Sequence, residues 1–102
     1  MSQAIHYVSY KLKKDASIPD FLAAQTALGD EEVSKQPGFV SWQLMRAGDI
    51  WADAITFETM DDLLAFEAAS STPSELARKF YSFLNLSAAG SSFRKFEVVA
   101  TR

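Results

Sequence analysis

Cysteine is absent from this chain of 102 residues, and histidine occurs only once, at His6. Without cysteine the chain cannot form disulfides, thiolate zinc sites or iron–sulfur clusters, and it has no thiol nucleophile. A single imidazole cannot build a multi-histidine metal site, and the sequence contains no nucleotide-binding motif. We therefore expect a protein that binds neither a metal nor an organic cofactor.

Positive charge and long apolar runs are also lacking. The 10 lysine and arginine residues are outnumbered by 13 acidic residues, and the net charge of −3 argues against nucleic acid as a partner. No apolar run approaches the roughly 20 residues that span a bilayer, so we expect no membrane contact. The first residues lack the signal-peptide order of positive charge followed by an apolar stretch, which leads us to expect a cytoplasmic protein.

Glycine and proline are few, with four and three residues, and they separate segments of regular hydrophobic spacing. Pro37-Gly38 and Gly48-Asp49 are typical turns, and residues 72–75 are typical of a helix start with Thr72 as the N-cap. Alternating or aromatic-rich segments predict four strands, and spacing near 3.6 residues predicts three helices. The strands are expected over residues 4–12, 39–46, 50–58 and 93–100.

The resulting order, β-α-β-β-α-α-β, is that of a ferredoxin-like split βαβ arrangement. It predicts one α+β domain over residues 1–102, with a four-stranded antiparallel sheet and helices on one face. A two-residue turn at Gly48-Asp49 pairs Arg46 with Trp51 and Leu44 with Asp53. The same register pairs Val40 with Phe57 and places Phe39 on the opposite face. A three-residue turn would exchange the two faces, because a slip of one residue reverses every side chain.

Neither face of the predicted sheet is polar. On the first strand Ile5 and Tyr7 lie on one side and Val8 and Tyr10 on the other, and the last strand has apolar residues on both sides as well. A split βαβ arrangement covers one face with its own helices, so the other apolar face needs a different cover. A second copy of the same sheet supplies it most simply, which predicts a homodimer through the sheet face.

Two segments resemble a known family. Residues 36–46 read Gln-Pro-Gly-Phe-Val-Ser-Trp-Gln-Leu-Met-Arg, and residues 51–62 read Trp-Ala-Asp-Ala-Ile-Thr-Phe-Glu-Thr-Met-Asp-Asp. They resemble the antibiotic-biosynthesis-monooxygenase-like proteins of the dimeric α+β barrel superfamily, although Phe57 stands where tryptophan is frequent. The resemblance implies ferredoxin-like units whose sheets pack face to face in a dimer, often with a small-molecule pocket between sheet and helices.

Asp53 and His6 are the candidate catalytic residues. Aspartate is disfavoured in the middle of a strand, so a partner is expected to satisfy Asp53. It is either a pocket acid or base with a pKa raised by apolar neighbours, or one half of an ion pair with Arg46 or another cross-strand residue. His6, on the first strand, is either a base or hydrogen-bonding group for a substrate, or a satisfied strand histidine.

The candidate substrate-binding residues are mostly aromatic. They could hold a small apolar or aromatic ligand, although strand aromatics are also common in cores and interfaces. Arg46 is an alternative anion-binding group, and Tyr81 could cap a pocket. The full candidate set is Tyr10, Trp42, Trp51, Phe57 and Arg46.

Two functions of different classes remain open from the sequence. The first is a cofactor-independent monooxygenase acting on an aromatic or polyketide-like compound, as the resemblance implies. The second is a non-catalytic module that binds a ligand or simply dimerises. The haem degradation of some superfamily members does not carry over, because His6 lies on a strand and Asn85 at a helix end. An RNA-recognition module shares the element order but has its aromatic motif on the strand after the hairpin, with a basic flank that is lacking here.

Overall fold

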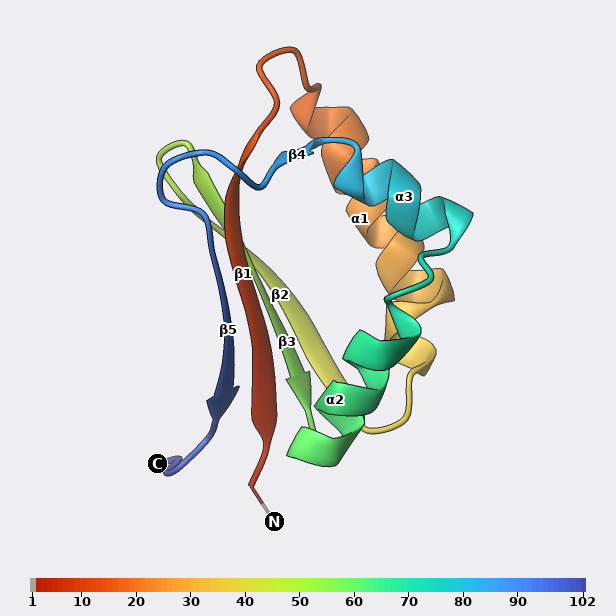
Figure 1. The fold of residues 1–102 in the computed structure, drawn as a ribbon, viewed down its shortest axis with the longest axis vertical. Coiled ribbons are helices and arrows are strands. Elements are labelled where there is room, and N and C mark those ends of the chain that lie inside the picture. The colour runs from red at the N-terminus through yellow and green to blue at the C-terminus, as the bar shows by residue number, and fades with distance from the viewer. Residues whose placement is uncertain (1) are drawn as a thin grey trace.

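The computed structural model describes residues 2–102, which form a sheet and three α-helices (Figure 1). The strands are β1 (Ala4–Leu12), β2 (Phe39–Ala47), β3 (Ile50–Phe57), β4 (Leu84–Asn85) and β5 (Ser92–Glu97). The helices are α1 (Ile18–Glu31), a 3₁₀ turn η1 (Val33–Lys35), α2 (Met60–Ala69) and α3 (Glu75–Tyr81).

The antiparallel sheet has β1 and β3 at its centre. Its order is β2-β3-β1, and the far edge of β1 pairs with both β5 and β4. This confirms the α+β, ferredoxin-like prediction, with one correction: the sheet has five strands rather than four. The extra strand arises because the chain leaving α3 pairs with Lys11 and Leu12 before it loops to β5. The three helices lie on one side of the sheet (Figure 1).

Each helix begins at a hydroxyl side chain that accepts a backbone N–H bond from its first turn. Ser17 caps α1 and Thr59 caps α2, where the Asp62 carboxylate also accepts a bond from the Thr59 hydroxyl. The expectation that Thr72 caps α3 is wrong, because Ser74 accepts from the backbone N–H of Ala77 and fills that position. The later start lengthens the link between α2 and α3.

The hairpin has the predicted two-residue turn. Ala47 pairs with Ile50, Arg46 with Trp51 and Leu44 with Asp53. The register shifts between Phe39 and Ser41, so Phe57 pairs with Phe39 rather than with Val40. The predicted faces of Phe39 and Val40 are therefore exchanged, while Phe57 keeps its predicted face, because one extra residue in a strand reverses the alternation beyond it.

The bulge has a clear packing reason. Phe39 lies against the core, with its ring 6.5 Å from that of Phe57 in an edge-to-face arrangement, whereas Val40 is 43% exposed. An aromatic ring has more apolar area to bury than valine, so this exchange favours the core. Pro37-Gly38 makes the turn into β2, and Gly38 has the left-handed φ of 76° that glycine adopts freely.

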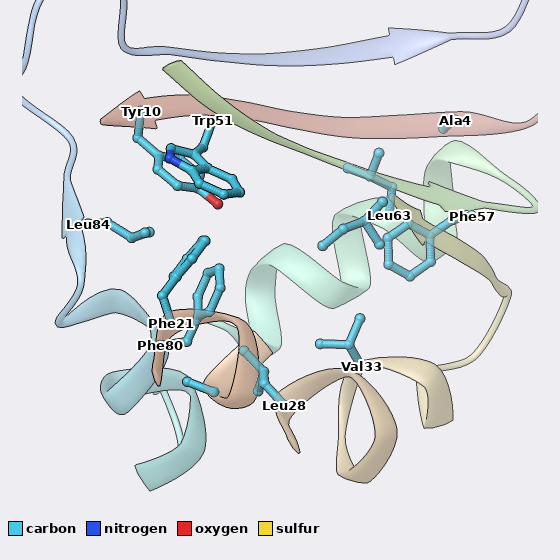
Figure 2. Close-up of a cluster of buried hydrophobic side chains, with 12 residues drawn as sticks. Ala4, Tyr10, Phe21, Leu28, Val33, Trp51, Phe57, Leu63, Phe80 and Leu84 are labelled. Atoms are coloured by element: carbon cyan, nitrogen blue, oxygen red, sulfur yellow. The ribbon is translucent and has the colours of Figure 1, made fainter. Parts of the chain in front are cut away.

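The core lies between the sheet and the helices. Phe21 of α1 is fully buried, stacks on Phe80 of α3 at 5.4 Å and meets the Trp51 ring edge-on at 5.2 Å. Figure 2 shows Phe21 and Phe80 side by side below Tyr10 and Trp51, with Leu63, Phe57 and Val33 gathered at the other end. Burial of each such side chain contributes roughly 1.5–3 kcal/mol, which anchors α1 and α3 over the sheet.

The opposite face of the sheet has no helix over it and carries mostly apolar side chains. Val40 is 43% exposed, Met45 41% and Phe96 46%, and the ring of Tyr7 packs edge-on against Phe96. We call this surface the open face; its apolar residues are Ile5, Tyr7, Val40, Met45, Ala52, Ala54 and Phe96, and the same register adds Ser41, Gln43, Thr56 and Arg94. None of the helices in residues 2–102 is long and apolar enough to cross a membrane.

Candidate active site

A cavity of about 520 Å³ lies between the sheet and the helices. Its floor consists of side chains from β1, β2 and β3, and its walls come from α1, α2, α3 and the segments after α1, α2 and α3. The lining is mostly apolar, with a few polar side chains among the hydrophobic ones. Both the size and the lining are those of a small-molecule site.

Asp53 is the buried carboxylate of this cavity, and only 5% of the residue is exposed. The Tyr10 hydroxyl donates a hydrogen bond to its Oδ1 at 3.0 Å, and the Trp42 indole Nε1 donates to the same oxygen at 3.1 Å. The other carboxylate oxygen, Oδ2, accepts no hydrogen bond from residues 2–102. This second oxygen is therefore the one left for a ligand in the cavity.

The strand register explains why these three side chains meet. Asp53 pairs with Val8 on one side and with Leu44 on the other. Tyr10 is two residues beyond Val8 and Trp42 is two residues before Leu44, so both point to the same face as Asp53 from the flanking strands. The predicted two-residue turn is what brings Trp42 to this position.

Burial raises the pKa of Asp53 to about 7, because the apolar surroundings disfavour the charged form. The hydrogen bonds from Trp42 and Tyr10 act in the opposite direction and stabilise the carboxylate. Burial and the nearby Asp53 charge raise the pKa of Tyr10, and the same two causes raise that of Tyr81. Asp53 can therefore exchange a proton near neutral pH, as a general acid or base must.

The expected ion pair between Asp53 and Arg46 does not form. Arg46 stacks its guanidinium 4.8 Å from the centre of the Trp51 ring, and its Nε donates to the carbonyl of Gly48 in the hairpin turn. Asp53 takes two neutral donors instead of a cation. A neutral partner compensates burial less completely than an opposite charge would, which is consistent with the raised pKa.

His6 also lines the cavity, on β1. Its Nδ1 lies 2.8 Å from the Oε2 of Glu67 on α2, and the Nζ of Lys95 on β5 lies 3.0 Å from Oε1 of the same carboxylate. The edges of the Phe66 and Phe93 rings meet the imidazole at 5.6 and 5.1 Å between centroids.

The structure separates the other candidate residues into two groups. Trp42 lines the cavity, and Tyr10 is fully buried beside Asp53. Trp51 and Phe57 belong to the hydrophobic core, and Arg46 lies at the exposed hairpin end of β2. The cavity lining within residues 2–102 includes none of Tyr10, Trp51, Phe57 or Arg46.

Two further features of the site lie on the helical side. Tyr81 lines the cavity from α3, in keeping with a capping position. Glu67 was not among the candidates, yet it stands four residues after the buried Leu63 and next to Phe66, on the inner stripe of α2. An acidic residue on the apolar stripe of a helix is the signal that could have identified it.

No group of three histidine, aspartate or glutamate side chains in residues 2–102 is arranged to hold a metal ion.

Comparison with known proteins supports the fold. No protein-family model and no curated protein matches the sequence. A variant of SnoaB, a cofactor-independent oxygenase from Streptomyces nogalater, superimposes with a TM-score of 0.74 at 15% identity, covering 99% of this chain and 97% of the other. A Streptomyces coelicolor monooxygenase in complex with nanaomycin D gives 0.71 at 14% identity, covering 99% and 91%.

A third similar structure is a dimeric protein of unknown function and ferredoxin-like fold from Bacteroides fragilis. Its TM-score is 0.60 at 16% identity, with 94% of this chain and 96% of the other covered. At these identities the likeness defines a fold class, the one that the resemblance predicts. Two of the three proteins are oxygenases and the third has no known function, so the fold by itself assigns no reaction.

The raised pKa of Asp53 predicts a distinctive dependence of stability on pH. The unfolded carboxyl ionises near its ordinary value of 3.8 and the folded one near 7, so the folded chain binds more protons between these values. The free energy of unfolding contributed by Asp53 therefore falls as pH rises through this window, by up to roughly 4 kcal/mol. Asp53→Asn should abolish that fall, so that urea denaturation shows the variant gaining stability over the wild type towards pH 8.

Asp15→Asn is the matched control, because Asp15 is an exposed aspartate in the turn after β1. Its stability curve should run parallel to that of the wild type. Parallel curves for Asp53→Asn and the wild type would show that the carboxyl is not held near neutral pKa.

Proposed function

We propose that the protein is a cofactor-independent oxygenase that acts on an aromatic or polyketide-like compound bound between the sheet and the helices. The observation that carries the proposal is a cavity carboxylate, Asp53, with a pKa near 7 and one oxygen left for a ligand. The shared fold with the two Streptomyces enzymes supports it.

Asp53 starts the proposed reaction by removing a proton from an acidic C–H or O–H of the substrate. For a substrate with a CH₂ between aromatic rings, the resulting carbanion gives its electrons to dioxygen and forms a C–O bond. The peroxide takes the proton back from Asp53 and becomes a hydroperoxide. Loss of the remaining C–H proton and cleavage of the O–O bond leave a ketone and water. The balance is R₂CH₂ + O₂ → R₂C=O + H₂O.

The cavity offers what such chemistry needs from a protein. Its apolar walls exclude water from the anion, which strengthens every hydrogen bond inside. Trp42 presents an indole ring to the cavity while its Nε1 holds Asp53, and such a ring can pack against an aromatic substrate. We assign His6 as the second catalytic residue, on the same face of the sheet.

We also propose that the protein is a homodimer through the open face. Exposed apolar patches of this kind mark interaction sites, and an identical sheet offers a self-complementary cover. The dimeric ferredoxin-like protein from Bacteroides fragilis supports this assembly. The cavity lies on the other side of the sheet, so each subunit keeps its own site.

Oxygen uptake tests the catalytic role of Asp53. Anthrone is a suitable probe, because its CH₂ is acidified by two rings and a carbonyl. Asp53→Asn should lower kcat/KM for oxygen consumption by roughly 10²–10⁴-fold, since general-base catalysis contributes about that much. Asp15→Asn should retain full activity. Binding of anthrone by the wild type without oxygen uptake would instead favour the non-catalytic ligand-binding module.

The hydrogen bond from Tyr10 predicts a shift in the pH profile. This bond stabilises the ionised carboxylate, so Tyr10→Phe should raise the pKa of Asp53 above about 7. The rising limb of kcat/KM against pH should then move to higher pH, with activity recovered in alkaline solution. An unchanged limb with a uniformly lower rate would show that Tyr10 acts on packing alone.

Oligomeric state tests the open face. Native mass spectrometry of the 11.3 kDa chain at micromolar concentration should show two copies. Met45→Glu should weaken the dimer at least about tenfold by burying a charge. Leu22→Glu is the control, because Leu22 on α1 is equally exposed, at 41%, but lies on the helical side. A monomeric wild type, or equal loss in both variants, would contradict the proposed interface.

A further inference from the structure

A second polar cluster adjoins the cavity apart from Asp53: His6 lines the cavity, and Glu67 and Lys95 lie beside it, outside the lining. His6 on β1 and Lys95 on β5 are directly paired across their strands. Glu67 of α2 joins the two, with Oε2 at 2.8 Å from His6 Nδ1 and Oε1 at 3.0 Å from Lys95 Nζ. The side chain of Glu67 is 18% exposed and that of His6 15%, so both are largely withdrawn from water.

The carboxylate determines which ring nitrogen of His6 is free. A carboxylate can only accept hydrogen bonds, so Nδ1 must carry the hydrogen that it donates to Glu67. Nε2 is then the remaining nitrogen, and its lone pair can accept a bond from a ligand hydroxyl. Lys95 Nζ contacts the other oxygen of the same carboxylate, so both oxygens of Glu67 have a partner.

His6 and Asp53 face the same cavity from neighbouring positions. Val8 pairs with Asp53, and His6 is two residues before Val8 on the same face of β1. The backbones of such diagonal neighbours are separated by roughly 7–8 Å, so one ligand can reach both side chains. The apolar side chains of Val8 and Ile55 also line this part of the cavity. The cavity therefore presents two polar anchors among apolar side chains; Ser9 and Ser92 also line it, and their hydroxyls bond to each other.

We propose that Glu67 is a positioning residue that fixes His6 as a second ligand anchor, and that the cavity selects compounds with two oxygen functions over compounds with one. One oxygen function meets Asp53 Oδ2 and the other, a hydroxyl, donates to His6 Nε2. This inference deepens the proposed function, because it names the substrate class of the same site. A compound with a single oxygen function leaves one anchor without a partner, and an unpaired buried polar group disfavours binding.

Histidine NMR tests the positioning step directly. Because His6 is the only histidine, the imidazole ¹⁵N signals of labelled protein come from this residue alone. In the neutral ring Nδ1 should be the protonated nitrogen, and Glu67→Ala should shift the population towards the Nε2-protonated form. Glu67→Gln retains an acceptor oxygen and should preserve the wild-type form. An Nε2-protonated ring in the wild type would overturn the assignment.

Calorimetric binding tests the substrate class with naphthol and a panel of naphthalenediol isomers as probes. At least one diol should bind the wild type about tenfold more tightly than naphthol, as one additional buried hydrogen bond predicts. Diol binding should also move the Nε2 signal. Glu67→Ala should reduce the preference to less than about threefold, whereas Glu31→Ala, at an exposed glutamate near the end of α1, should leave it unchanged.

The outcomes separate this inference from the proposed function. Equal affinities for naphthol and all diols, including no binding by either, would overturn the two-anchor site even if anthrone is oxidised. A diol preference with a shifted Nε2 signal supports the two-anchor site even if no probe consumes oxygen. The comparison of probes on the unmodified protein needs no variant, so it also stands if Glu67→Ala fails to fold.

Discussion

The burial of one carboxylate among apolar side chains is the constraint on which this site depends. Asp53 sits in the middle of β3, and two neutral donors from the flanking strands hold it in place. A charged partner would have stabilised the ionised form and left a permanent, inert anion. Neutral donors hold the oxygen in position and leave the pKa of the carboxyl near 7. Burial of this carboxyl lowers the stability of the fold at neutral pH and provides a group that can exchange protons.

Much of this arrangement could be read from the sequence, because strands alternate and a short turn defines the pairing. The Gly48-Asp49 turn predicted the pairing of Asp53 with Leu44, and an aspartate in mid-strand marked the site. The bulge at Val40 was not visible, because it follows from how well the Phe39 ring fills the core. The ion pair with Asp53 does not form because Arg46 packs over the ring of Trp51, its predicted partner across the hairpin; the spacing predicted the pairing but not the preference of the guanidinium for the ring.

The helical side of the site was harder to predict, because its geometry depends on how α2 and α3 pack over the sheet. Glu67 reaches His6 across 61 residues of sequence, and only the folded chain brings them together. The sheet itself performs two separate tasks through its alternation. His6 and Val8 of β1 line the cavity, whereas Ile5 and Tyr7 lie on the open face. Either surface can therefore change without disturbing the other.

The two tryptophans occupy different surroundings, and this difference makes the protein its own optical reporter. Trp51 is buried in the core with the Arg46 guanidinium over its ring. Trp42 lies in the cavity wall and donates its indole N–H to Asp53. The emission of Trp42 is therefore coupled both to the charge on that carboxylate and to whatever fills the cavity. Trp51 supplies a reference within the same molecule.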